Sequence, residues 1–118
     1  MEFQPAPERW VATTPRGRRI RLSEAAWVRK ILVSHPEFAH PPAYEQEIRL
    51  AVEQPEYIVE GWEGELLSLR WCPVAPKGPK YLCVVYREAE PIGFVITAFF
   101  VSRYGKLLRR VIRWQRHH

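Results

Sequence analysis

Two runs of apolar residues dominate the second half of the chain, over residues 81–86 and 93–101. Both are rich in β-branched and aromatic side chains, which favour a pleated and buried strand. The segment 87–92 between them is charged and contains Pro91, which is typical of a hairpin loop. Thr97 is the only polar side chain in the second run. We therefore expect these runs to be the central strands of a sheet that the rest of the chain covers or extends.

Shorter strands are predicted before this pair. Residues 66–72 alternate in polarity, so Ser68 and Arg70 share one face while Leu and Trp side chains occupy the other. A Pro-Arg-Gly turn separates two further apolar stretches and indicates a small hairpin. The remaining predicted strands cover residues 10–13, 19–22 and 57–59.

Two helices are predicted in the first half of the chain. Ser23 provides an N-cap for the first helix, and Pro36 limits its end to about Ser34. His35 then lies at or just past the last turn, where its side chain can project toward the sheet edge. The second helix covers residues 43–54, in which apolar positions recur at helical spacing.

The tail after Gly105 fits two alternatives. Apolar residues at helical spacing alternate with basic residues and favour an amphipathic basic helix. An edge strand ending in Trp114 is the other alternative. In either case the order of a hairpin, two helices and then antiparallel strands indicates one α+β domain over residues 1–118. Residues 1–8 hold two prolines and are expected to be a flexible lead-in.

Composition narrows the class of protein. No apolar run approaches the roughly 20 residues that span a bilayer, and the N-terminus lacks a signal-peptide pattern, so we expect a cytoplasmic protein without a membrane partner. Cys72 and Cys83 are too few for a disulfide framework and are expected to be buried free thiols. His35 and His40 have no cysteine nearby, so no metal site is expected. Dinucleotide and P-loop fingerprints are missing, and no cofactor is expected.

Basic residues are unevenly distributed. The formal net charge is +5, and one cluster lies between residues 103 and 116 with no acid among them. A second cluster lies over residues 16–21. Such clusters suit a polyanion such as RNA or DNA, although a solvated face is the alternative. The cations predicted to contact nucleic acid are Lys80, Arg87, Arg109, Arg110 and Arg113.

A spaced pattern of motifs resembles the barnase–EndoU–colicin–RelE-like (BECR) nucleases encoded by phages and bacteria. The motifs are His35-Pro36-Glu37, Tyr81-Leu82-x-Val84-Val85 and Ile96-Thr97-Ala98-Phe99, with a tryptophan near the end. The resemblance covers residues 13 to 114 or so and implies two N-terminal helices packed on a four- to five-stranded antiparallel sheet. It also implies metal-independent cleavage of RNA, often as a toxin, with an antitoxin or immunity protein as a possible partner.

The resemblance assigns two residues and shows three departures. His35 matches the histidine of the family's HPE motif, and Thr97 matches the threonine of a strand motif that usually reads TAY. Phe99 replaces the tyrosine of that motif, while Ser34 and Lys30 stand where relatives often carry arginine and histidine. The missing tyrosine hydroxyl favours a non-catalytic module built on the same scaffold.

Metal-free RNA cleavage requires a base for the 2′-OH proton, an acid for the leaving oxygen and cations around the phosphate. His35 is the predicted acid/base, Arg70 the predicted phosphate ligand, and Thr97 the residue that orients one of them. Each has a structural alternative, namely a helix cap, a solvent-facing strand residue and a backbone-bonded hydroxyl. We therefore predict an endoribonuclease that acts by 2′-OH transphosphorylation. A nucleic-acid-binding module and a protein-interaction module with a docking tail are the alternatives.

Overall fold

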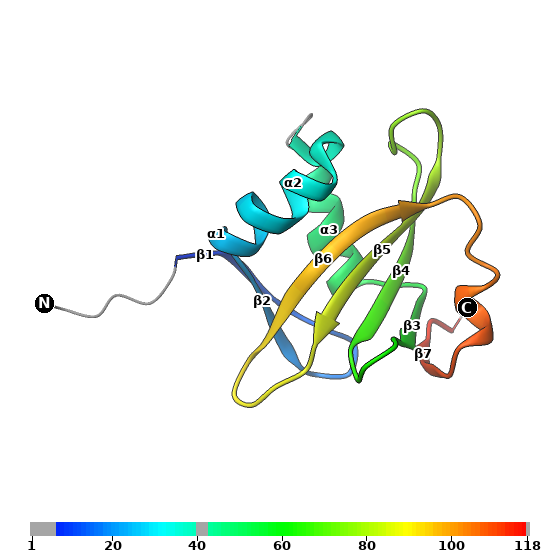
Figure 1. Cartoon of the computed structure of the whole chain (residues 1–118). Coiled ribbons are helices and arrows are strands. Elements are labelled where there is room, and N and C mark those ends of the chain that lie inside the picture. Colours follow the sequence, from blue (N-terminus) through cyan, green and yellow to red (C-terminus); the bar gives the residue numbers. More distant parts are fainter. Residues whose placement is uncertain (1–6, 40–42, 118) are drawn as a thin grey trace, which may run out of the picture.

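In a computed structural model, which describes residues 7–39 and 43–117, the chain folds around one mixed sheet of seven strands. The strands lie in the order β1-β2-β6-β5-β4-β3-β7 (Figure 1). Within this sheet β2 and β6 are parallel, and the other neighbours are antiparallel. The strands are β1 (Glu8–Thr13), β2 (Arg19–Ser23), β3 (Tyr57–Glu60), β4 (Leu66–Cys72), β5 (Lys80–Arg87), β6 (Gly93–Val101) and β7 (Ile112–Gln115).

The prediction of two helices on a four- to five-stranded antiparallel sheet is wrong. The N-terminal hairpin joins the main sheet through the parallel β2–β6 pair, and β3 and β7 extend the opposite end. Among the residues that the structure describes, only α3 (Ala43–Glu53) is a regular helix of several turns, with 11 residues. The sequence pattern identified most strands individually but not these long-range pairings, which set the size and the mixed character of the sheet.

The first predicted helix is a composite helical segment. A single turn α1 (Glu24–Ala26) and a single turn α2 (Leu32–Ser34) flank a π-helical turn over Trp27–Ile31. The Leu32 amide donates to the Trp27 carbonyl, five residues back, which widens the helix locally. A spacing of four between Trp27 and Ile31 suits both helix types, so periodicity could not distinguish them. His35 lies at the C-cap, directly after Ser34.

The larger hydrophobic core lies between these helices and one face of the sheet (Figure 1). Leu82, Val84 and Tyr86 of β5 face it, together with Phe38 and Ile48 from the helical side. The register pairs Ser68 with Val84 and Arg70 with Leu82, so these two β4 residues point to the helix-covered face. The face of β4 that was interpreted as polar is therefore part of the core, and Ser68 is fully buried there.

A smaller core lies on the opposite face of the sheet. Cys83 and Val85 of β5 face this side, and Leu107 and Leu108 pack against it from the tail. The tail forms a short 3-10 turn over Leu107–Arg109 and then the edge strand β7, which pairs with β3; the amphipathic basic helix does not form. We call these the helix-covered face and the tail-covered face.

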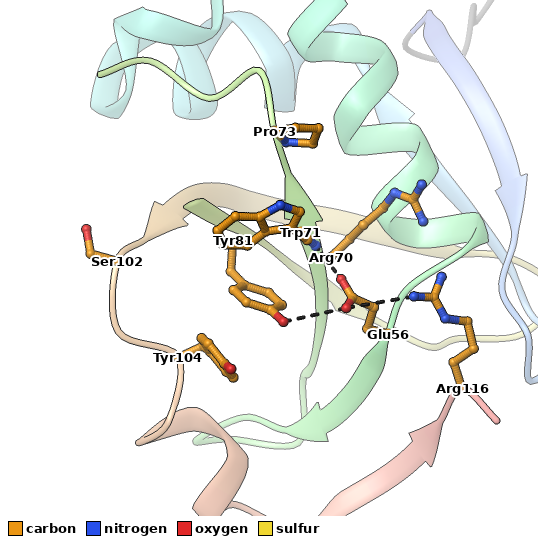
Figure 2. Close-up of a pocket in the computed structure, with 8 residues that line it drawn as sticks. All are labelled: Glu56, Arg70, Trp71, Pro73, Tyr81, Ser102, Tyr104 and Arg116. Atoms are coloured by element: carbon orange, nitrogen blue, oxygen red, sulfur yellow. Dashed lines mark hydrogen bonds and ion pairs between the residues drawn. The ribbon is translucent and has the colours of Figure 1, made fainter. Parts of the chain in front are cut away.

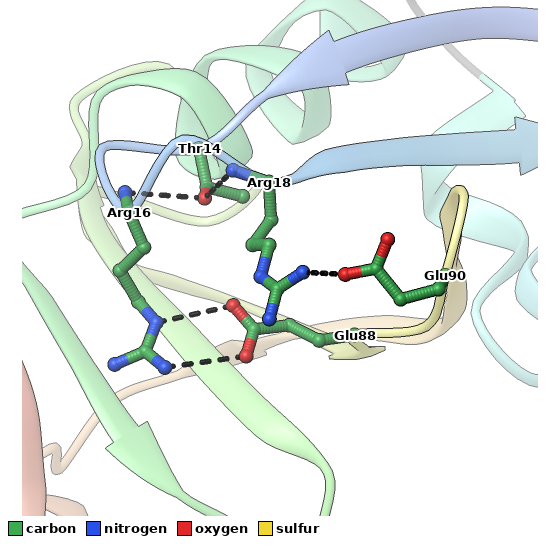
Figure 3. Close-up of polar contacts among 5 residues, drawn as sticks. All are labelled: Thr14, Arg16, Arg18, Glu88 and Glu90. Atoms are coloured by element: carbon green, nitrogen blue, oxygen red, sulfur yellow. Dashed lines mark hydrogen bonds and ion pairs between the residues drawn. The ribbon is translucent and has the colours of Figure 1, made fainter.

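The basic cluster at the N-terminal hairpin turn is neutralised by acids of the β5–β6 loop (Figure 3). Arg16 makes two contacts with the Glu88 carboxylate, at 3.1 and 3.2 Å, and Arg18 pairs with Glu90. The Thr14 hydroxyl accepts from the backbone amides of both arginines. These contacts hold the hairpin turn against the β5–β6 loop, beside the parallel pairing of β2 with β6. The hydrogen bond to Glu88 also raises the pKa of Arg16.

Gly93 permits the close approach of strands β2 and β6. A Cβ atom at this position would lie 2.2 Å from the Arg87 carbonyl oxygen and 2.7 Å from the Ile20 side chain. Both neighbours are held in the sheet, so the parallel pairing of Ile20 with Gly93 requires glycine there.

Other predictions from composition can be compared with the described residues. Cys72 and Cys83 are buried free cysteines, as predicted. Residues 1–6 of the predicted lead-in lie outside the described residues, whereas Glu8 already pairs with Ser23 in the sheet. No helix among residues 7–39 and 43–117 is long and apolar enough to cross a membrane.

Candidate nucleic-acid interface

An aromatic pocket of about 740 Å³ lies where β3 begins, at the end of β4 (Figure 2). Trp71, Tyr81 and Tyr104 line it. The Trp71 and Tyr81 rings meet edge to face with centroids 5.2 Å apart, and Tyr104 lies 4.0 Å from Tyr81 in a tilted stack. Trp71 remains 45% exposed, so one broad aromatic surface is open to a ligand.

Sheet register and the tail together build this pocket. Trp71 and Tyr81 are direct cross-strand partners in β4 and β5, which places both rings on the tail-covered face. Tyr104 enters from the segment after β6, where its carbonyl accepts the amides of Leu107 and Leu108 and starts the 3-10 turn. Together with Glu56 and Arg116, five separate segments of the chain thus meet at one site.

Glu56 is the acidic group of the aromatic pocket. Its carboxylate accepts the backbone amide of Trp71, and Oε1 lies 3.5 Å from the Tyr81 hydroxyl and 3.7 Å from Arg116. The Glu56 amide donates to Leu69, and its carbonyl accepts from the Arg116 amide, so both neighbouring strands fix its backbone. Burial, followed by the nearby Glu56 charge, raises the pKa of Tyr81 to about 12 and keeps its hydroxyl protonated.

Arg70, the predicted phosphate ligand, lies along the wall of the same pocket (Figure 2). Its Nη1 donates to the Gln54 carbonyl at 2.6 Å, just after the C-terminus of α3. This contact satisfies a carbonyl at the helix end and places the positive charge where the helix dipole is negative. Its position therefore gives Arg70 a structural role in holding α3 against β4.

His35, the predicted acid/base, lies at a different place in the fold. Its Nδ1 is 3.5 Å from the Glu37 carboxylate, and the ring centroid lies 6.2 Å from Phe99. The imidazole is partly open, with 31% of the side chain exposed. A smaller pocket of about 310 Å³ adjoins Glu37 and is lined on its other side by Lys77 and Lys80.

The structure does not bring the three predicted catalytic residues together. Thr97 pairs with Val85 on the tail-covered face, whereas Arg70 pairs with Leu82 on the helix-covered face. His35 contacts Phe99, which is two residues from Thr97 on the same strand. His35 therefore contacts the part of β6 that carries Thr97. Arg70 and Thr97 lie on opposite faces of the sheet.

Most cations predicted to contact nucleic acid are already paired within the protein. Arg87 contacts the Glu65 carboxylate at 3.5 Å, and Arg113 pairs with Glu60. Arg110 donates to the carbonyls of Glu60 and Gly61 and lies over the Trp62 ring at 4.6 Å. Lys80 donates to the carbonyls of Pro76 and Gly78.

The Arg87–Glu65 and Arg113–Glu60 pairs line an acid-balanced pocket of about 520 Å³ beside the loop after β3, together with Arg16 and Glu88. The backbone amides of Trp62 and Glu63 donate to Glu65, which lowers the pKa of that carboxyl, with Arg87 adding a smaller effect. The mixture of signs in this pocket leaves little net attraction for a polyanion.

Unpaired cations lie instead on the turn that follows β6. Within the described residues, the side chains of Arg103, Lys106 and Arg109 make no hydrogen bond or ion pair, and all three are exposed. They flank Tyr104, which belongs to the aromatic pocket. We call residues 103–109 the basic turn. Only Arg109 of this group was predicted to contact nucleic acid.

Sequence reasoning missed the aromatic pocket because the alternation in residues 66–72 placed Trp71 on the apolar face of its strand, beside the leucines. The signal was present in the predicted strands: pairing residues 66–72 with 81–86 as a hairpin places Trp71 opposite Tyr81. The contributions of Glu56 and Tyr104 carried no local signal.

Comparisons with protein-family models, with curated proteins and with solved structures found no match to this chain. The BECR resemblance therefore remains an inference from short motifs. In the part of the chain that the structure describes, no three His, Cys, Asp or Glu side chains form a group able to hold a metal ion, and His40 lies outside that part.

Proposed function

We propose that the protein binds single-stranded RNA across the aromatic pocket and the basic turn. The observation that carries the proposal is the convergence of Trp71, Tyr81 and Tyr104 beside unpaired cations. Aromatic side chains stack on bases of any sequence and contribute about 1–3 kcal/mol per base. The likeness to BECR nucleases supports RNA as the nucleic acid.

The distribution of charge supports the same location. Elsewhere in the described residues, Arg16, Arg87 and Arg113 are held by carboxylates, whereas Arg19, Arg29, Lys30 and Lys77 also make no ion pair but lie in other segments of the chain. The basic turn keeps its positive charge available for phosphates, and each phosphate contact releases counterions and makes binding salt-dependent. A strand that stacks a base on Trp71 can therefore pass its backbone along the turn that carries Tyr104.

The test is a binding titration of a labelled U-rich oligonucleotide, followed by fluorescence anisotropy. Trp71→Ala is expected to weaken binding about ten-fold or more, because it removes the exposed stacking surface. Trp62→Ala is the matched control, since Trp62 is 61% exposed but lies in the acid-balanced pocket under Arg110. Equal affinities of the wild type and Trp71→Ala would count against the proposal.

A second candidate function is metal-independent cleavage of the bound RNA, with His35 as acid/base. It is favoured by the partly exposed imidazole, whose Nδ1 faces the Glu37 carboxylate and leaves Nε2 available for proton transfer. In this reaction the 2′-oxygen loses its proton and bonds to phosphorus, the bond to the 5′-oxygen breaks, and that oxygen gains a proton. Lys77 and Lys80 line the pocket that adjoins Glu37 and would be the cations that contact the phosphate.

Cleavage is tested by incubating the protein with RNA in EDTA. His35→Ala is expected to abolish cleavage while leaving oligonucleotide affinity within about two-fold, because His35 lies outside the aromatic pocket. His117→Ala controls for loss of an exposed histidine. Cleavage that persists in His35→Ala would leave only the binding function. The same holds if the cleavage activity separates from the wild-type protein during purification.

A further inference from the structure

The aromatic pocket contains an acidic side chain where a nucleic-acid site would be expected to hold only cations. Glu56 stands between Trp71, Tyr81 and Arg116, and its side chain is 21% exposed (Figure 2). A carboxylate repels phosphates, so its place in a site that binds RNA calls for a ligand group that donates hydrogen bonds. Base edges carry such groups.

We propose that this pocket selects guanine, with the Glu56 carboxylate accepting from the Watson–Crick edge of a base stacked on Trp71. This inference rests on the proposed binding of single-stranded RNA. Guanine presents two adjacent donors on that edge, N1–H and the 2-amino group, and a carboxylate can accept both. Next to them lies the O6 acceptor, which Arg116 is placed to contact because it lies 3.7 Å from Glu56 Oε1.

The other bases match this arrangement less well. Adenine and cytosine each place a ring nitrogen acceptor beside their amino group, and that lone pair would face the carboxylate. Uracil offers a single N–H donor between two carbonyl oxygens. Only guanine supplies an acceptor for the arginine followed by two donors for the carboxylate.

Glu56 is already held in position for this role. Its Oε2 accepts the backbone amide of Trp71, the residue whose indole ring supplies the stacking surface. The carboxylate that would contact the base edge is therefore fixed next to the ring on which the base would stack. Its backbone is bonded to Leu69 on one side and to Arg116 on the other. Oε1 has two long contacts, 3.5 Å to the Tyr81 hydroxyl and 3.7 Å to Arg116, and therefore keeps capacity for a stronger donor.

The experiment compares U-rich oligonucleotides that differ at one central position, carrying guanine, inosine, adenine, cytosine or uracil. For the wild-type chain, guanine is expected to bind about ten-fold tighter than adenine, cytosine or uracil. Inosine keeps N1–H and O6 but lacks the 2-amino group, so it should fall between guanine and uracil. This order identifies the edge of the base that the protein reads.

Glu56→Gln tests the residue. Its amide oxygen can still accept from the Trp71 amide, which leaves the NH₂ group facing the guanine donors and should remove the preference for guanine while the uracil oligonucleotide still binds. Glu60→Gln is the control, because Glu60 pairs with Arg113 in the acid-balanced pocket and should retain the preference. Thermal melts of both variants verify that they are folded.

Each outcome has a distinct meaning. Loss of the guanine preference in Glu56→Gln alone supports the inference. An equal preference in Glu56→Gln and the wild type, or binding of all oligonucleotides with the same affinity, overturns guanine selection and leaves RNA binding standing. Failure of the wild type to bind any of them overturns both proposals.

Discussion

The two faces of the sheet are covered in different ways, and the difference separates the main source of stability from the proposed binding surface. On the helix-covered face, Phe38, Ile48 and Tyr86 are fully buried in one large cluster. On the tail-covered face, Leu107 and Leu108 are only partly buried over a smaller cluster. A face closed by helices has little room for a ligand, whereas a face closed by one irregular segment leaves open the pocket beside it.

Truncation of the larger core should have the greatest effect. Ile48→Ala removes a fully buried side chain of α3 from the helix-covered face and is expected to lower the free energy of unfolding by about 2–5 kcal/mol. Urea denaturation measures this loss. RNA affinity of the folded fraction should be unchanged, and a parallel loss of affinity would show that the two faces are not separable.

Alkaline pH should reveal the next largest effect, again on the helix-covered face. Burial raises the pKa of Tyr86 from its ordinary 10.0 to about 12, so between these values the unfolded chain loses this proton while the folded chain keeps it. The unfolded state is therefore favoured as pH rises through that window, by up to about 2–3 kcal/mol. Urea denaturation from pH 9 to pH 12 should show that the free energy of unfolding falls less steeply for Tyr86→Phe than for the wild type. Identical slopes would contradict the burial argument.

A substitution on the tail-covered face should lower the stability less than Ile48→Ala does, and should lower the RNA affinity more. Leu108→Ala removes a partly buried side chain that packs the basic turn against the sheet. We expect it to lower the free energy of unfolding by about 1 kcal/mol. Because the turn carries Tyr104 and three cations, RNA binding should weaken by a larger factor than in Ile48→Ala. Anisotropy titration of both variants at one temperature makes the comparison. Equal affinities would place the binding surface elsewhere.

The smallest effect should come from a single exposed cation. Arg109→Gln is expected to reduce the slope of log affinity against log salt by about 0.7, the value for one phosphate contact on a single strand. Arg19→Gln is the control, since Arg19 is exposed on β2, which pairs with the beginning of β6 at Gly93, whereas the basic turn follows the other end of that strand. Equal slopes for the two variants would mean that the basic turn does not contact phosphate.

Local sequence patterns identified individual elements well. Runs of β-branched and aromatic residues located β5 and β6, and the helical spacing over residues 43–54 located α3. These signals work because they reflect neighbours within one element. The π turn at Trp27–Ile31 was not predicted, because its buried residues keep the spacing of an α-helix.

Long-range pairing could not be read from the same patterns. Strand β2 pairs with β6 across more than half of the chain, and the acids that neutralise Arg16 and Arg18 lie in a distant loop. For the same reason the basic clusters overstated the charge available to a ligand. Polarity alone also misplaced Arg70, because an arginine that caps a helix end points into a covered face.

The aromatic pocket is assembled from widely spaced parts of the chain, of which Tyr104 and Arg116 come near the C-terminal end of the sequence. Synthesis proceeds from the N-terminus, so most of the sheet is available before these residues leave the ribosome. A nascent chain would thus hold most of the sheet without a complete aromatic pocket. If that pocket binds RNA as proposed, such timing would keep the growing protein from engaging the message or the ribosomal RNA beside which it is made.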